Sequence, residues 1–372
     1  MLKVDLERFW TEDEIAHLNN CFNPKATQVA LGIRMSDECV FAELGVPGDP
    51  WGFTGREERM RLNKLYNDRA EKIVGKRLLS EQYPIDDMMF PYVKRIGEVF
   101  GGRYEHHKNT GEWLYSGIDT EQALEELLDK VDRLNLREFM LPTNWESEKT
   151  RLLDTYGLRP KQMRHIRGPV TLAMSIYGSE NLIFLGYDNP ELFARFSNTI
   201  RRVVIEMAEI MDAESAQPKG ETPHGFSFAD DNCSLLTPDL YEVFGYSVLK
   251  AVFEKFSPNA EDIRFQHSDS EMSHLLPILG KLNLTGCNFG PTVLVEAIRK
   301  HMPNTRIDGC LAPFTFMTNN QEKIMSEVRR DCDAIRRTST MGLNLTTAGS
   351  INNGSSLESM RTVMHVIQNY CR

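Results

Sequence analysis

"GFSFADDNCSLLTPDLYEVFGYSVLKAVFEKFSPNAEDIRFQHSD", residues 225–269, contains the pattern that decides the fold. A short apolar run ends in two aspartates, and a helical stretch follows, with Thr237 suited to the N-cap and Pro238 to the first turn. A second short apolar run then ends in His267 and Asp269. The stretch therefore predicts a strand, a helix and a strand, which is the repeating unit of a parallel sheet.

The same alternation extends from residue 137 to residue 371. Further strands are expected at residues 137–144, 164–168, 285–291, 305–310 and 342–349. Helical patterns lie between or after them, at residues 169–178, 189–214, 271–282, 292–302, 320–338 and 356–371. Six regular βα units and a less regular N-terminal part predict a (β/α)8 TIM barrel. The alternative, a doubly wound open sheet, usually carries a G-x-G-x-x-G loop, which this sequence lacks.

We expect one barrel domain over residues 1–372. Residues 1–130 would form an N-terminal helical cap and the first barrel elements, and residues 135–372 the regular βα units. The long charged pattern at residues 55–79 is typical of such a cap. Four tryptophans, which either pack the cap or line a pocket for an apolar ligand, fall in or just beyond this part: Trp10, Trp51, Trp113 and Trp145.

Composition excludes several classes of protein. The chain is 41% hydrophobic and 26% charged, with a net charge of −10 and no stripe of Lys or Arg, which argues against a nucleic-acid or anionic-membrane partner. No run of 18 uncharged apolar residues is present, and the first 15 residues are too charged for a signal peptide, so a cytoplasmic location is expected. The seven cysteines are scattered and contain no C-x-x-C, which predicts reduced thiols and no disulfide framework.

The ends of the expected strands carry polar side chains. In a β/α barrel the residues that follow the strands converge on one face, where the active site lies. The strand ends here are Asp230 and Asp231, His267 to Asp269, Asn288 and Gly290, Asp308 and Cys310, and Thr346 and Thr347. We therefore predict a functional cluster on one rim, with His267, Asp231, Asp269 and Asp230 as catalytic residues.

An imidazole beside carboxylates supports two kinds of chemistry. The groups can act as general acid and base, or they can bind zinc. His267, Asp231 and Cys310 are the candidate zinc ligands, and Cys310 is the best thiolate candidate because it ends a strand. Nucleophilic hydrolysis is not indicated, because the sequence has no G-x-S-x-G motif.

Several segments resemble the uroporphyrinogen decarboxylase (URO-D) superfamily. They are "GPVTLA" with the following "DNPELF" helix, "FADD", "FQHSDS", and the ending "GLNLTTAGSINNGSSLESMRTVM". The resemblance covers residues 135–372 and implies a (β/α)8 barrel. Decarboxylases of this superfamily carry an N-terminal stretch of arginines that bind substrate carboxylates, and the nearest segment here, "VALGIRMSDECVF", keeps only Arg34. The resemblance therefore argues against porphyrinogen decarboxylation.

Thiol methyltransferases of the superfamily bind zinc through H-x-C and a later cysteine. Here Asp269 replaces the first cysteine, and Gly349 stands at the later position. The resemblance thus implies the branch that demethylates methyl ethers or methylamines and passes the methyl group to a corrinoid (cobalamin) protein, with zinc as an additional cofactor. A uroporphyrinogen decarboxylase-like lyase and a non-catalytic barrel remain the alternatives.

This reading implies a corrinoid protein and a small methylated substrate as partners, and a homodimer is left open. Aromatic walls favour a methoxylated aromatic donor, although they would also accept a quaternary amine. Trp51, Trp113, Asn288 and Thr346 are the expected substrate-binding residues.

Overall fold

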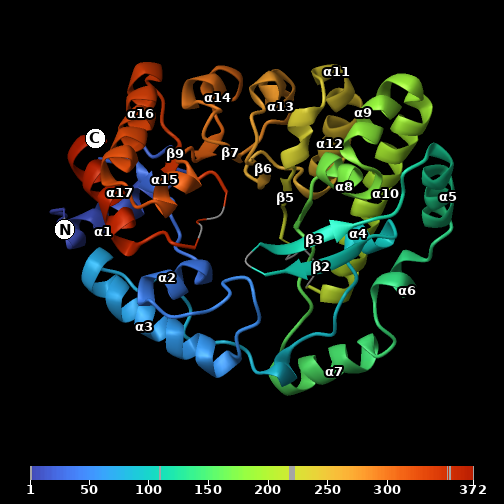
Figure 1. Ribbon diagram of the computed structural model, residues 1–372, viewed down its shortest axis with the longest axis horizontal. Coiled ribbons are helices and arrows are strands. Elements are labelled where there is room, and N and C mark those ends of the chain that lie inside the picture. The colour runs from blue at the N-terminus through green and yellow to red at the C-terminus, as the bar shows by residue number, and fades with distance from the viewer. Residues whose placement is uncertain (1, 109, 218–222, 350, 352, 372) are drawn as a thin grey trace. The chain divides into compact units, whose positions relative to one another are not determined.

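The computed structural model describes residues 2–108, 110–217, 223–349, 351 and 353–371 (Figure 1). The chain divides into two compact units. Unit 1 comprises Met1–Tyr83, Lys108–Gly111 and His267–Arg372, and unit 2 comprises Pro84–His107 and Glu112–Gln266. The division falls inside strand β6 (Arg264–Ser268), so His267 is the first residue of the returning part of unit 1.

Seven strands of the described chain form one sheet in the order β1-β9-β8-β7-β6-β5-β4. Where their registers are given, neighbouring strands are parallel. The strands are β1 (Ala30–Leu31), β4 (His165–Arg167), β5 (Phe226–Ala229), β6, β7 (Gly286–Phe289), β8 (Arg306–Asp308) and β9 (Leu343–Leu345). Consecutive strands from β4 to β9 are sheet neighbours and helices lie between them along the chain, which confirms the predicted β/α barrel class.

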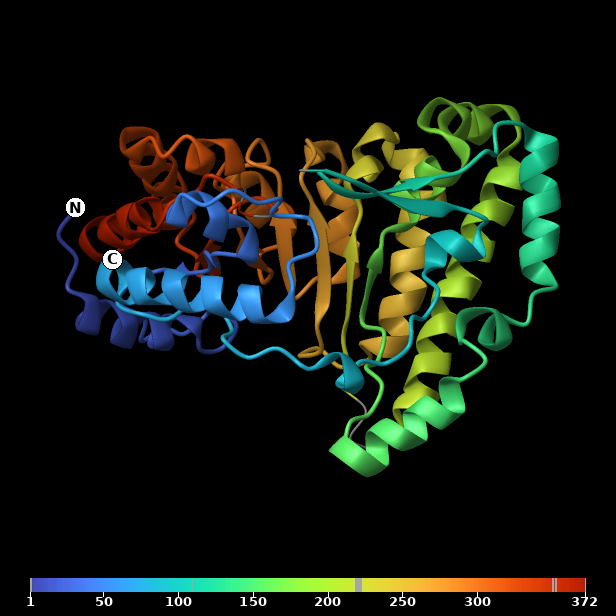
Figure 2. The same cartoon turned by 60° about the horizontal axis from the view of Figure 1, so that its bottom comes forward.

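Unit 1 joins the two ends of the chain. Its helical segments are α1 (Leu6–His17), η1 (Asp37–Cys39), α2 (Val40–Leu44), α3 (Arg56–Val74), η5 (Ser273–Leu275), α13 (Leu276–Leu279), η6 (Gly280–Leu282), α14 (Val295–His301), α15 (Pro313–Met317), α16 (Gln321–Thr338) and α17 (Leu357–Tyr370). The backbone amide of Asp5 donates to the side chain of Gln368 at 2.9 Å, and β1 pairs with β9. Figures 1 and 2 accordingly show the first and last helices side by side.

Unit 2 is built around one long helix, α10 (Pro190–Ser215), which lies beside α12 (Ser247–Phe256) (Figures 1 and 2). Phe193 of α10 packs against Phe244, which lies in the helical turn before α12, with ring centroids 4.7 Å apart. The other elements are η2 (Asp86–Met88), α4 (Ile96–Val99), α5 (Glu121–Asp132), α6 (Leu136–Met140), α7 (Trp145–Tyr156), α8 (Pro169–Tyr177), α9 (Ser179–Asp188), η3 (Asp231–Leu235), α11 (Pro238–Tyr241) and η4 (Glu242–Tyr246), and the hairpin of β2 (Arg103–His107) and β3 (Gly111–Tyr115).

The structure corrects two sequence predictions. The strand expected at residues 137–144 is the helix α6, which begins because the side chain of Asn135 accepts a hydrogen bond from the amide of Glu138. The expectation of reduced thiols is wrong for Cys332 and Cys371, which form a disulfide. Cys332 lies on α16 and Cys371 follows α17, and the close packing of these two helices brings the cysteines together.

No helix among the described residues is long and apolar enough to cross a membrane.

Candidate functional site

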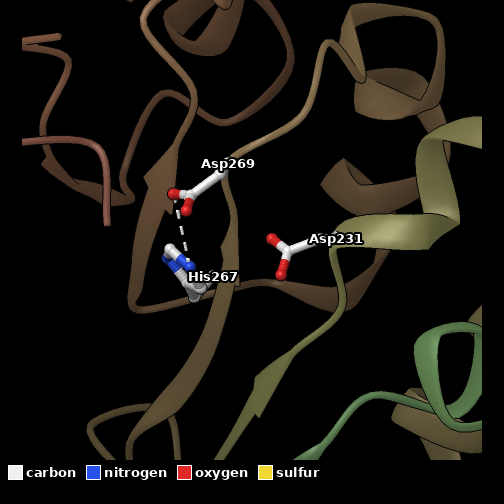
Figure 3. Close-up of side chains that lie close together, drawn as sticks. All are labelled: Asp231, His267 and Asp269. Atoms are coloured by element: carbon white, nitrogen blue, oxygen red, sulfur yellow. Dashed lines mark ion pairs between the residues drawn. The ribbon is translucent and has the colours of Figure 1, made fainter. Parts of the chain in front are cut away.

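His267 and Asp269 lie at the carboxyl end of β6. His267 is the fourth residue of the strand, and Asp269 follows its last residue. Figure 3 shows the two side chains turned toward each other, with Nε2 of His267 3.4 Å from Oδ1 of Asp269. The side chain of His267 is 22% exposed and that of Asp269 is 54% exposed, so solutes can reach the pair.

Asn288, in β7, fixes the orientation of the His267 ring. Its Nδ2 donates to the carbonyl oxygens of Thr347, at 3.0 Å, and of Asp308. Its Oδ1 accepts from the amide of Gly349 at 2.8 Å and lies 2.7 Å from Nδ1 of His267. Because this oxygen can only accept, Nδ1 must carry the proton. In the neutral ring the lone pair is then on Nε2, the nitrogen that faces Asp269.

Gly349 makes room for the carboxylate of Asp269. A Cβ atom at position 349 would lie 2.4 Å from Oδ1 and 2.6 Å from Oδ2 of Asp269, and the glycine has a φ of +80°. Gly290 is confined in a similar way, since its Cβ would lie 2.3 Å from the backbone oxygen of Asp269. The Asp269 carboxylate can therefore occupy its position only because residue 349 has no side chain.

The His267–Asp269 pair can hold a proton or a cation. When the ring is neutral, the Nε2 lone pair and the carboxylate oxygen are two acceptors facing each other, which is unfavourable unless a positive charge lies between them. A proton on Nε2 makes the ring a general acid next to its carboxylate. A divalent metal would use the same two atoms as ligands, and the Nδ1–H bond to Asn288 is the outer contact that metal-binding histidines commonly make.

Asp230 serves a different purpose at the end of β5. It is fully buried, and its Oδ1 accepts from the amide of Thr171 in the first turn of α8 at 2.7 Å. Burial raises the pKa of this carboxyl to about 6, and the amides at the start of α8 oppose the rise. Gly168 lies in close contact with Asp230, since a Cβ atom at position 168 would be 2.2 Å from the Asp230 Cβ. Asp230 thus holds the start of α8, and the structure gives it no exposed atom for a substrate.

Asp231 begins η3, one residue beyond Asp230, and is half-buried. Within unit 2, η3 contacts the end of β6, because Nε2 of Gln266 donates to the sulfur of Cys233 at 3.8 Å. Gln266 immediately precedes His267 in the chain. Asp231 is the third side chain drawn in Figure 3, beside those of His267 and Asp269.

Comparison with known proteins gives the family. Residues 163–370, more than half of the chain, match the family described as uroporphyrinogen decarboxylase (URO-D). The chain belongs to the URO-D family. The matched segment contains Asp230, Asp231, His267, Asp269, Asn288 and Gly349.

One of two similar solved structures indicates a fold shared with this URO-D family chain. A methyltransferase from Methanosarcina mazei superposes with a TM-score of 0.56 at 12% identity, over 93% of this chain and 95% of the other. A B12-independent methionine synthase from Shewanella sp. W3-18-1, in complex with selenomethionine, gives a TM-score of 0.37 at 11% identity, over 91% and 92% of the two chains. Only the first likeness is close enough to indicate a shared fold. No curated protein matches the sequence.

Cys310 is a poor metal ligand in this URO-D family chain. Its side chain is 1% exposed, and its backbone amide donates to Asp331 at 3.3 Å. Burial, with the charge of Asp331 adding to it, raises the pKa of the thiol well above its ordinary value. The thiolate that zinc requires is therefore disfavoured, and the structure does not support the predicted ligand role.

The residues predicted to bind substrate have different surroundings. Asn288 uses both of its amide atoms on protein groups, so the structure gives it the role of positioning His267. Thr346, just after β9, is half-buried, and its carbonyl accepts from Leu311 at 3.1 Å. Trp51 is 41% exposed in unit 1 and Trp113 is 55% exposed in unit 2, so both indoles are accessible.

The other two tryptophans are used in packing. The indole of Trp10 donates to the carbonyl of Val74 at 2.7 Å, at the end of α3. Trp145 is 3% exposed and donates to Glu214 at 2.8 Å. The aromatic surface available to a substrate is thus smaller than the sequence suggested.

Proposed function

We propose that this URO-D family protein is a methyltransferase that moves a methyl group from a small methylated donor to the cobalt of a corrinoid protein. The observation that carries the proposal is the His267–Asp269 pair, with Nδ1 of the ring held by Asn288 and Nε2 directed at the carboxylate. A methyl ether or methylamine releases its methyl group only when its oxygen or nitrogen receives positive charge. A positive charge would be stabilised between Nε2 of His267 and the carboxylate of Asp269.

His267 would be the acid. When the C–O bond of a methyl ether breaks, the leaving oxygen takes both bonding electrons, and a proton from Nε2 would neutralise it. Asp269 would stabilise the imidazolium before the transfer, and Asn288 would keep the ring from rotating during it. Protonation of a poor leaving group typically accelerates such a step by 10²–10⁴-fold.

Zinc is the cofactor that this residue set would accept in place of the proton on Nε2, because the one lone pair of that nitrogen cannot bind both. Zinc binds three or four protein ligands, and nitrogen of His and oxygen of Asp are among its usual ligands. His267 and Asp269 would supply two of these ligands through Nε2 and a carboxylate oxygen. A bound zinc ion would supply Lewis-acid polarisation of the donor's oxygen. Asp231 remains a proposed ligand and catalytic residue.

A methoxylated aromatic is the favoured donor. A porphyrinogen is a polycarboxylate, and this chain is unsuited to bind one. It keeps only Arg34 of the arginine stretch described for the decarboxylases, and its net charge is −10. Two accessible indoles, Trp51 and Trp113, offer flat apolar surface for a ring. The alternative donor, a quaternary amine, would need no acid, because its nitrogen already carries the charge.

The test is a methylation assay that follows the cobalt spectrum of a reduced corrinoid protein. The wild-type protein should methylate cobalt from a methoxylated phenol, and His267→Ala should lose most of this activity while keeping its unfolding temperature. His274→Ala, at an exposed position in η5, is the control and should retain the activity. Methylation from betaine-like amines alone would reverse the donor ranking.

Two outcomes would contradict the proposal. Wild-type activity in His267→Ala would show that this residue is structural. Failure to methylate cobalt from any donor would favour a lyase or a non-catalytic barrel. Elemental analysis addresses the metal separately. We expect at most one zinc per chain, and where zinc is bound it should be lost in His267→Ala and in Asp269→Ala but not in Cys310→Ala.

A further inference from the structure

A cavity lies in unit 2, along β4 and the start of β5. Its volume is about 890 Å³, within the range of small-molecule sites. It is lined by residues 161–164 and 223–225, which precede β4 and β5, and by residues 165–167 and 226–227 of the strands themselves, whereas Asp230 and Asp231 follow the carboxyl end of β5. Residues 93–96, Tyr104, Met140, Ile263 and two methionines of α10 complete the lining.

The cavity is cationic in an acidic protein. Five Lys and Arg side chains line it, and none of its lining residues, all of which are described, is Asp or Glu. They are Lys94, Arg95, Lys161, Arg164 and Arg167. The chain as a whole has a net charge of −10, so the positive charge of this lining is opposite in sign to that of the whole chain.

Only part of this positive charge is neutralised by the protein. Arg95 is paired with Glu112 at 2.7 Å, and Arg164 with Asp212 at 2.8 Å. Lys94, Lys161 and Arg167 have no carboxylate within ion-pair distance among the described residues. The ammonium of Lys94 lies 4.1 Å from the ring centre of Phe139, and Arg167 donates to the hydroxyl of Ser175 at 3.1 Å.

One further donor in the lining is unused. Nε2 of Gln162 is buried and has no hydrogen-bond partner in the described chain. A buried amide nitrogen without an acceptor is costly, and an anionic ligand would supply the missing acceptor.

The rest of the lining is apolar and adaptable. Four methionines contribute to it, and Met140 and Met207 are almost completely buried. Methionine side chains are unbranched and adjust to apolar groups of different shapes. Phe226 and Ile263 add further apolar surface.

We infer that this cavity binds an amphipathic anion, a molecule with an apolar body and one carboxylate or phosphate group. The anionic group would lie against Lys94, Lys161 and Arg167 and accept from Gln162, and the apolar body would lie against the methionines. The site does not depend on the methyl-transfer function, because it uses none of the residues proposed for that reaction.

Isothermal titration of the full-length protein with matched ten-carbon probes tests the inference. Decanoate and decyl phosphate should each bind saturably with one site per chain, and the better of the two identifies the headgroup. Decan-1-ol and decylamine should bind at least tenfold more weakly, since they lack the negative charge. The affinity for decanoate should fall as salt is raised.

Variants locate the site. Lys161→Gln and Arg167→Gln should each weaken decanoate binding about tenfold, as expected for loss of a charge-assisted hydrogen bond. Lys250→Gln, on the exposed face of α12 in the same unit, is the matched control and should bind as the wild type does. All three should give the wild-type circular dichroism spectrum.

Three results would overturn the inference: no saturable binding of either anion, equal binding of decan-1-ol, or unchanged affinity in both cavity variants. If a variant does not fold, the salt dependence and the anion preference of the wild-type protein still decide.

Discussion

At the scale of single residues, the site depends on two positions that differ together, Asp269 and Gly349. The superfamily resemblance placed Asp269 and Gly349 where thiol methyltransferases have cysteines. The structure explains why both differ together, because the space that a side chain at 349 would fill is occupied by the Asp269 carboxylate. A side chain at 349 and the Asp269 carboxylate would therefore compete for the same space.

We predict that Gly349→Ala removes methyl transfer. The new methyl group would meet both carboxylate oxygens of Asp269, and a φ of +80° adds about 1–2 kcal/mol of backbone strain. Gly45→Ala is the matched control, since Gly45 has a φ of +68° and no atom within 4 Å of its Cβ position. Both variants should unfold at a lower temperature than the wild type, but only Gly349→Ala should lose activity. Equal activity in the two would show that Asp269 need not hold its position.

Asp230 gives a prediction about pH. Its pKa is raised to about 6 in the fold, above the value near 3.9 of an unfolded chain. Between these values the folded state binds more protons, so this group's contribution to stability is complete below about pH 4 and is lost as the pH rises through 6. The total effect is roughly 3 kcal/mol.

Urea unfolding of wild type and Asp230→Asn between pH 4 and pH 8 measures this effect. The variant should gain stability relative to the wild type as the pH rises, and the gain should level off above about pH 7. Asp239→Asn, at an exposed position in α11, is the surface control for the loss of one carboxylate. A pH-independent difference for Asp230→Asn would mean that Asp230 is not protonated in the fold.

At the scale of elements, the disulfide links α16 to the end of α17. The two cysteines are separated by 39 residues in sequence. Closing a loop of this length stabilises a fold by roughly 3–4 kcal/mol through the unfolded chain. Reduction of the wild-type protein should therefore lower its unfolding temperature, and Cys371→Ser should unfold at the same lower temperature. If a reducing agent also destabilises Cys371→Ser, the effect has another cause.

The sequence predicted those elements whose signals are local. The strands β4 to β9 were found because each is a short apolar run followed by polar residues, and Thr237 caps α11 as expected, accepting from the amide of Leu240. The strand β1 was missed, because it has two residues and its partner β9 lies about 300 residues away in the chain. The disulfide was missed for the same reason, since helix packing alone brings its cysteines together.

The sequence predicted the reactive residues of the site but not the hydrogen bonds that hold them in place. His267 and Asp269 were recognisable because they end a strand. The role of Asn288 depends on three carbonyl or amide groups from β8 and the segment after β9, and no spacing in the sequence reveals it. The signal that could have indicated it is the run of glycines and small residues at the ends of β7 and β9.

At the scale of the whole molecule, unit 1 is assembled from both ends of the chain. The amide of Gly32 donates to the carbonyl of Leu345 at 2.8 Å, and α3 packs on α17. Residues 2–83 thus depend on contacts with β9 and α17.

We predict that deletion of residues 341–372 unfolds the N-terminal helices while the core of unit 2 persists. Hydrogen exchange should show loss of protection in α1 and α3, and retained protection in α10 and α12, which serve as the internal control. Retained protection in α3 would show that the first 83 residues fold without β9 and α17.

The contact between Gly168 and Asp230 has a consequence for how this protein can evolve. With only 2.2 Å available above the Asp230 Cβ, any side chain at 168 requires a backbone shift or a smaller residue at 230. The two positions are 62 apart in sequence but cannot mutate independently. In related sequences we expect them to covary, with glycine at 168 accompanying a carboxylate at 230, and a larger residue at 168 appearing only together with Gly at 230, since alanine would keep the Cβ that clashes. An engineered chain that imports one half of this pair from a relative would have to import the other.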